Sequence, residues 1–334
     1  MCVASRPLCA VTANYAFSHG NKECLSCGSG QLLSYTQVAT SSHTAPTNTT
    51  KASIRDYLMA PPSPLHQRPR RILMLHGFTQ SGELFHAKTR PLEKALAKAF
   101  PGIELIYPTA PIALSANDLP SREEAPPPPS APAPVDCWAW WRAREPRGEY
   151  VGLEQSLECI SDLLHREGPF DGIVGFSQGA AAAAMMAALL ETGRREVFAD
   201  AHTANRDCLS LPASVAQLDH PPLRFAVFYS GFSSEHQLYT AFYTPPIATP
   251  SLHFIGSLDT IVDESWTQEL VAHCESGTAS VALHPGGHFV PTGKRETAVV
   301  IDFIRKVYLN EKNQTADSAT GVEDDDVLDM DFPF

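Results

Sequence analysis

The hydrophobic positions of this chain fall into short apolar runs that alternate with longer amphipathic stretches between about residues 71 and 309. The apolar runs predict buried strands, at residues 72–75, 103–107, 170–174, 223–229, 251–255 and 280–283. The amphipathic stretches have helical spacing and predict helices, at residues 83–100, 153–165, 178–191, 263–274 and 292–308. This alternation is typical of one α/β domain, with a mostly parallel central sheet and helices on both faces.

The pattern is missing from both ends and from two internal segments. Residues 1–67 have no sustained periodicity and are expected to form a disordered leader. Residues 115–134 are rich in proline, which cannot donate a backbone hydrogen bond, and they predict a surface loop inserted in the domain. Residues 200–222 are polar and predict irregular structure, and residues 310–334 predict a disordered acidic tail. The folded domain is therefore expected over residues 68–309.

Composition and charge narrow the class of partner. The 334 residues are 43% hydrophobic and 19% charged, which suits a globular core. The net charge of −12 argues against a nucleic-acid partner, because phosphate binding requires a basic surface. The longest apolar run, residues 180–190, is well short of the ~18 residues that would predict a membrane span. The N-terminus lacks a charged start followed by a continuous apolar segment, so we expect a cytoplasmic protein.

Two of the eight cysteines have the spacing of zinc ligands. They form the motif Cys24-Leu-Ser-Cys27. A structural zinc site needs four ligands, usually from two such pairs, and the chain has no second pair, although His19 and His43 are nearby. We therefore expect a reduced leader and no metal.

The strongest local signal is the motif Gly175-Phe-Ser-Gln-Gly179, which lies between a predicted strand and a predicted helix. A tight turn in this context lifts a serine hydroxyl above the edge of a sheet. Glycines would be needed where the strand and the helix pass too close for a Cβ. The alternative is an ordinary serine in a glycine-rich turn, but the flanking elements favour Ser177 as a nucleophile.

A serine nucleophile needs a base, and on this fold the chain order is serine, acid, histidine. His288 follows the last predicted strand in a glycine-rich loop, so we predict that it is the base. Asp259 follows the strand at residues 251–255, and we predict that it orients the histidine. Asp263 and Glu264 are rivals that stand where a helix begins, so capping is the more ordinary role for them.

Backbone amides should stabilise the oxyanion that forms in acyl transfer. One donor is expected from Gln178, which follows the nucleophile. The other is expected from the loop after the first strand, with Phe78 first and Thr79 next. His76 in the same loop could serve as a base, but the predicted triad is complete without it, so we expect it to brace the loop. The mechanism requires neither a metal nor an organic cofactor.

Several motifs resemble, in order, the fungal-type serine hydrolase (FSH) family of the α/β-hydrolase superfamily. They are residues 71–82 with Phe85, Lys88, Thr89 and Leu92, then residues 138–142, 175–179, 256–259 and 287–291. The resemblance implies an α/β-hydrolase fold with a triad of Ser177, Asp259 and His288, the residues that spacing also selects. It further implies a small esterase. Some fungal members release polyketide acyl chains from a carrier-protein thioester.

The aromatic cluster of Trp138, Trp140 and Trp141 has two interpretations: core packing, or the wall of an acyl pocket. Phe232 is a further candidate for the pocket. We expect a serine hydrolase that cleaves a carboxylic ester of a hydrophobic acyl group. A thioesterase acting on a carrier-bound polyketide or fatty acyl chain, with an acyl carrier domain as partner, is the alternative. A non-catalytic binding protein on the same fold is the second alternative.

Overall fold

The structure is a computed structural model that describes residues 70–115, 118, 136–144, 148–204 and 206–320. The predicted leader, most of the proline-rich insert, the Cys24–Cys27 pair and the end of the acidic tail lie outside the described residues. The main strands are β1 (Arg71–Leu75), β2 (Glu104–Ile106), β7 (Gly172–Phe176), β8 (Phe225–Tyr229), β9 (Ser251–Gly256) and β10 (Ala279–His284). The helices are α2 (Gly82–Ala99), α3 (Leu153–Glu167), α4 (Gln178–Leu189), α5 (Arg194–Thr203), α6 (Ala213–Ala216), α7 (Thr240–Tyr243), α8 (Glu264–Ala272) and α9 (Lys294–Thr320).

The six main strands form one sheet in the order β10-β9-β8-β7-β1-β2, and every neighbouring pair is parallel. β2 forms one edge of the sheet and pairs with β1. The next strand of the sheet along the chain, β7, pairs with the other side of β1. Such a reversal of strand order places a crevice at the carboxyl ends of the strands. Two short antiparallel pairs, β3 (Ile112–Ala113) with β4 (Trp138–Ala139) and β5 (Arg142–Arg144) with β6 (Glu149–Val151), lie outside the sheet.

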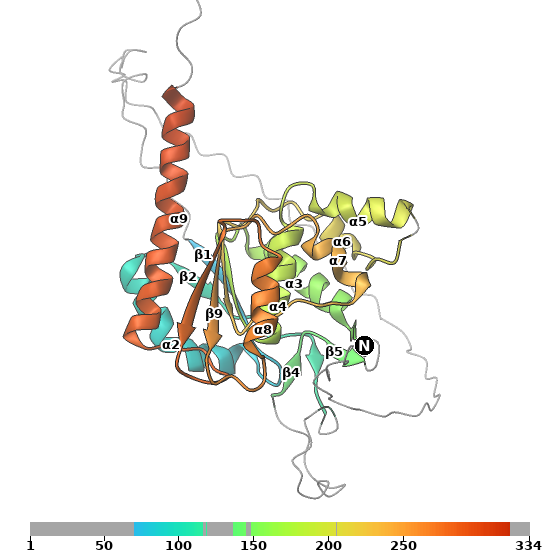
Figure 1. The fold of residues 1–334 in the computed structure, drawn as a ribbon, viewed down its shortest axis with the longest axis horizontal. Coiled ribbons are helices and arrows are strands. Elements are labelled where there is room, and N and C mark those ends of the chain that lie inside the picture. Colours follow the sequence, from blue (N-terminus) through green and yellow to red (C-terminus); the bar gives the residue numbers. More distant parts are fainter. Residues whose placement is uncertain (1–69, 116–117, 119–135, 145–147, 205, 321–334) are drawn as a thin grey trace, which may run out of the picture. The chain divides into compact units, whose positions relative to one another are not determined.

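Alternate residues of the sheet enter two separate cores. Leu73 and Leu75 of β1 pack on the face covered by α3 and α4. Ile72 and Met74 pack on the opposite face, against α2 and α9. Successive side chains of a strand point to opposite faces, so a continuous apolar run is required wherever helices cover both. The predicted sheet with helices on both faces is confirmed (Figure 1).

Two predictions about the helices differ from the structure. Residues 200–222, expected to be irregular, include the end of α5 and all of α6. Of the apolar residues of α5, only Phe198 and Ala201 are buried. An apolar stripe this narrow gives little helical periodicity in the sequence, so the helix was not predicted. α9 continues to Thr320, so residues 310–320 of the predicted disordered tail are helical. Within the described residues, no helix is long and apolar enough to cross a membrane.

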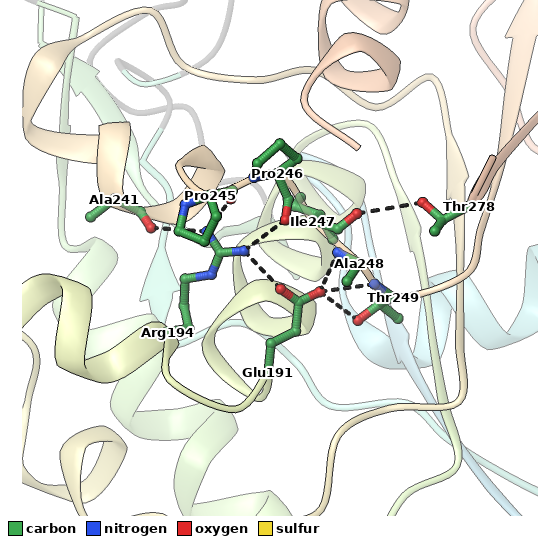
Figure 2. Close-up of polar contacts among 9 residues, drawn as sticks. All are labelled: Glu191, Arg194, Ala241, Pro245, Pro246, Ile247, Ala248, Thr249 and Thr278. Carbon is green, nitrogen blue, oxygen red and sulfur yellow. Dashed lines mark hydrogen bonds and ion pairs between the residues drawn. The ribbon is translucent and has the colours of Figure 1, made fainter. Parts of the chain in front are cut away.

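A buried ion pair fixes the connection between α7 and β9 (Figure 2). Arg194 at the start of α5 lies 2.7 Å from the Glu191 carboxylate and is 2% exposed. Its guanidinium also donates to the carbonyl oxygens of Pro245 and Pro246, while Glu191 accepts the amide N–H groups of Ala248 and Thr249. The segment therefore gains backbone hydrogen bonds that no regular element supplies.

Candidate functional site

Ser177 lies in a sharp turn between β7 and α4, with φ 53° and ψ −120°. A Cβ on Gly175 would come within 2.2 Å of the Gly179 carbonyl oxygen, and a Cβ on Gly179 within 2.3 Å of the carbonyl oxygens of Leu75 and His76. Both glycines of the motif are therefore required by backbone atoms that cannot move aside. The turn places the serine at the N-terminus of α4, where backbone N–H groups and the helix dipole favour negative charge.

The structure brings Ser177, His288 and Asp259 together in one hydrogen-bonded chain. Ser177 Oγ lies 2.9 Å from His288 Nε2, and His288 Nδ1 lies 2.8 Å from Asp259 Oδ2. A carboxylate only accepts, so Nδ1 carries the proton and Nε2 is left to accept from the serine hydroxyl. The three side chains come from the ends of β7, β9 and β10, which is where sequence analysis expected them.

Four hydrogen bonds hold the Asp259 carboxylate. Oδ2 accepts from His288 and from the hydroxyl of Ser230, at 2.8 Å each, and Oδ1 accepts the amide N–H groups of Ile261 and Val262 at 3.0 Å each. Burial alone would raise the pKa of Asp259, but these bonds stabilise the carboxylate and together leave the pKa below its ordinary value. Asp259 therefore stays ionised as the partner of His288.

Sequence reasoning missed Ser230. It directly follows the strand β8, and loops after parallel strands are where sites of this fold assemble, so its position alone was a usable signal.

The rival acid, Asp263, lies at the N-cap of α8 and accepts the amide N–H of Ser265 at 2.8 Å. This is the capping role expected for a residue where a helix begins. Glu264 is the first residue of the same helix. Of the three acids that sequence analysis considered, the structure places Asp259 against His288.

The predicted oxyanion donors are the backbone amides of Gln178 and Phe78. Within the part of the chain that the structure describes, neither the Gln178 N–H nor the Phe78 N–H has a hydrogen-bond acceptor. Thr79, the next candidate, donates its amide to the Trp138 carbonyl oxygen at 2.9 Å. The oxyanion role of Gln178 and Phe78 stays a prediction. The amide of the alternative donor, Thr79, already has an acceptor.

His76 braces its loop. Its side chain is buried, Nδ1 lies 2.8 Å from the Gly77 carbonyl oxygen and Nε2 accepts the Ala110 amide at 3.0 Å. Burial lowers the pKa of His76 to about 4, against a smaller raising effect of the bond to Gly77. The neutral ring thus holds one fixed tautomer, and its contacts are those expected of a brace.

The burial of two tryptophans agrees with the core-packing interpretation of the aromatic cluster. Trp140 and Trp141 are 0% and 2% exposed, so they belong to the core and present no surface to a substrate. Trp140 also supports the site, because its indole donates to the His76 carbonyl oxygen and its amide donates to the Gln178 side chain. Gln178 in turn donates to the Trp141 carbonyl oxygen. The tryptophan segment thereby joins the loop after β1 to the turn that carries the serine.

The remaining two aromatic candidates are half-buried. Trp138 donates its indole N–H to Asp136 Oδ1 at 3.0 Å. Phe232 follows β8 and its ring lies 6.5 Å from that of Trp266. Their contact with a substrate stays a prediction. Among the described residues, no group of three or more His, Cys, Asp or Glu side chains could hold a metal ion.

Comparison with known proteins points to one family. The model of the family described as serine hydrolase (FSH1) matches residues 66–300. Esterase OVCA2 of Danio rerio is 32% identical over 251 residues, which is 71% of this chain and 97% of that protein. Family of serine hydrolases 2 of Saccharomyces cerevisiae is 33% identical over 241 residues, or 71% of this chain and 96% of that protein.

A third relative is longer than this chain. A Schizosaccharomyces pombe protein named dihydrofolate reductase is 36% identical over 227 residues, which is 67% of this chain and 44% of that protein. The chain thus spans less than half of that relative. Among solved structures, Zea mays acyl-protein thioesterase 2 is similar at 18% identity with a TM-score of 0.48, covering 73% of this chain and 96% of that one.

Proposed function

The chain belongs to the FSH1 serine hydrolase family and has the α/β-hydrolase fold, and from this premise we propose that it hydrolyses carboxylic esters of hydrophobic acyl groups through an acyl-enzyme on Ser177. The observation that carries the proposal is the chain of hydrogen bonds from Ser177 Oγ through His288 to Asp259. Serine is a weak nucleophile at its free pKa, and a base in contact with it, oriented by a third group, makes it reactive.

In the first half of the reaction, Ser177 Oγ attacks the ester carbonyl carbon while His288 Nε2 takes the hydroxyl proton. The resulting imidazolium is stabilised by the ionised Asp259. The carbonyl oxygen becomes an oxyanion, which is stabilised by hydrogen bonds from the amides of Gln178 and Phe78. When the tetrahedral intermediate collapses, the bond to the leaving oxygen breaks, and that oxygen takes the proton from His288 to leave as an alcohol.

The second half repeats these steps with water. His288 accepts a proton from a water molecule, whose oxygen attacks the acyl carbon of the Ser177 ester. Collapse breaks the bond to Oγ and returns the proton to Ser177, which releases the carboxylic acid. A thioester would acylate Ser177 in the same way, with a thiol as leaving group.

Exposed apolar side chains in the two loops that carry Asp259 and His288 support a hydrophobic acyl group. Leu258 and Ile261 flank Asp259 and are 69% and 55% exposed, and Phe289 directly follows His288 and is 51% exposed. The two loops are in contact, since the Leu258 amide donates to the Gly286 carbonyl oxygen at 3.0 Å. An apolar chain laid on such side chains would remove both surfaces from water.

The test is labelling with a fluorophosphonate, which needs an activated serine and no knowledge of the substrate. We expect the full chain to be labelled on Ser177, with labelling abolished in Ser177→Ala. Ser161→Ala is the matched control, because Ser161 is a buried serine that donates to the Ser214 carbonyl oxygen outside the site. A folded wild-type chain that is neither labelled nor active on p-nitrophenyl butyrate would overturn the proposal and favour a binding protein. Parallel assays with butyryl pantetheine distinguish thioester from ester preference.

A further inference from the structure

Ser230 occupies the same position on β8 that Ser177 occupies on β7. The register of the two strands pairs Phe176 with Tyr229, so each serine is the next residue beyond a paired position. Ser177 donates its amide to the Tyr229 carbonyl oxygen at 2.8 Å, and Ser230 donates its amide to the Phe254 carbonyl oxygen of β9 at 3.0 Å. Three neighbouring strands are thus joined at their carboxyl ends by the backbone of these two serines.

Ser230 has φ 48°, in the left-handed region that non-glycine residues rarely adopt. A glycine would occupy such a position without this steric cost. The serine side chain therefore needs a compensating interaction. Its hydroxyl supplies one, since Oγ donates to Asp259 Oδ2 at 2.8 Å and the residue is 2% exposed.

The same oxygen, Asp259 Oδ2, also accepts from His288 Nδ1. Oδ1 is held by two amides of its own loop. Apart from His288 itself, the bond to Oδ2 comes from Ser230, which directly follows the neighbouring strand β8 and so ties the carboxylate to the sheet. We propose that Ser230 is a positioning residue, whose hydroxyl holds the Asp259 carboxylate so that Oδ2 faces His288 Nδ1. This inference rests on the proposed function, because it assigns Ser230 a part in keeping His288 ready to accept the Ser177 proton.

Among the described residues, His288 and His284 are the titratable groups that interact with Asp259. His288 contacts it directly, and His284 at the end of β10 is near enough to interact with its charge. Burial lowers the pKa of His284, which keeps that ring neutral. Loss of the Ser230 hydroxyl removes one of the four hydrogen bonds that stabilise the carboxylate, so protonation of Asp259 becomes easier.

The test uses Ser230→Ala and Ser230→Gly, with p-nitrophenyl butyrate as the probe. Both variants lack the hydroxyl, and glycine also tolerates the backbone conformation, so at least one is expected to fold. We expect kcat to fall about tenfold in both, the scale of one hydrogen bond to a charged group, with KM unchanged. The acid limb of the kcat/KM profile is expected to move to higher pH. Ser161→Ala controls for the loss of a buried serine hydroxyl elsewhere.

The outcomes separate this inference from the proposed function. If the folded wild-type chain is neither labelled by fluorophosphonate nor active on p-nitrophenyl butyrate, the proposed function fails. If the wild-type chain is labelled, and folded Ser230→Gly keeps the wild-type kcat and acid limb, the positioning role alone is overturned. A rise in KM with unchanged kcat would also overturn it, because it would make Ser230 a substrate contact.

Discussion

The carbonyl oxygen of Leu75, the last residue of β1, lies where a Cβ on Gly179 would come within 2.3 Å of it. This contact ties the first turn of α4 to the neighbouring strand. Because α4 is buried along its whole length, it has no room to move away. The approach of helix and strand thus depends on a residue without a side chain.

Gly179→Ala is therefore expected to prevent stable folding or to lower the free energy of unfolding by several kcal/mol. Chemical denaturation checks this. Gly102→Ala is the control, because a Cβ there meets nothing within 4 Å and only the positive φ of 81° adds a cost of about 1 kcal/mol. Equal losses in the two variants would contradict the steric argument.

Replacing Asp259 by asparagine is expected to lower kcat on p-nitrophenyl butyrate by roughly 10³- to 10⁴-fold. Asparagine has one acceptor oxygen, whereas the carboxylate accepts on two, so His288 loses the fixed tautomer that leaves Nε2 free. Asp263→Asn is the control: asparagine caps a helix about as well as aspartate, so both stability and kcat should stay near the wild-type values. A large loss of kcat in Asp263→Asn with little loss in Asp259→Asn would instead identify Asp263 as the acid of the triad.

Stability is expected to fall as the pH is lowered from about 6.5 to about 4. Burial lowers the pKa of both His76 and His253 to about 4, so in this window the unfolded chain binds protons that the folded chain does not. Each histidine then contributes a slope of up to about 1.4 kcal/mol per pH unit, with greater stability at higher pH.

Urea denaturation of the wild-type chain and of His253→Gln at several pH values measures this. The slope in the variant should be smaller by about the contribution of one histidine. A slope that is unchanged would mean that His253 is not kept neutral by burial.

Arg194→Met is expected to lower the free energy of unfolding by about 3–5 kcal/mol, because it leaves Glu191 in a buried site without its cation. The pair lies at the start of α5 and holds residues 245–249 (Figure 2), and none of these residues belongs to the predicted triad, so kcat per folded molecule should stay near the wild-type value. Arg305→Met removes an exposed pair with Asp302 and should cost less than about 1 kcal/mol. A loss of kcat without a loss of stability would contradict this structural role.

The double variant Leu258→Ser and Phe289→Ser should weaken the preference for long acyl chains. Both side chains are exposed and lie in the loops that carry Asp259 and His288, so their loss removes apolar surface that a chain could cover. We expect kcat/KM for p-nitrophenyl octanoate to fall about tenfold or more while that for the acetate changes little, since each buried CH₂ contributes about 0.8 kcal/mol. Leu309→Ser, an exposed leucine on α9, is the control. Equal losses for both esters would contradict the acyl-surface role.

The local pattern of the sequence was sufficient to predict the sheet and its main helices, and it selected three residues whose side chains lie together in the structure. Apolar runs mark strands covered on both faces, and parallel strands bring the loops that follow them to one edge. Ser177, Asp259 and His288 each follow such a strand, so their order along the chain already indicated that they would meet.

Only the tertiary structure decided which side chains of similar type are buried, which are exposed and which form hydrogen bonds in the site. Trp140 and Phe289 are both large and apolar, yet Trp140 is buried, whereas Phe289, the residue after His288, is exposed. Ser230 directly follows a strand, as Ser177 does, but its contact with Asp259 depends on the register of three strands. Periodicity reports which face of an element is apolar, whereas hydrogen bonds between residues far apart along the chain exist only once those elements have packed.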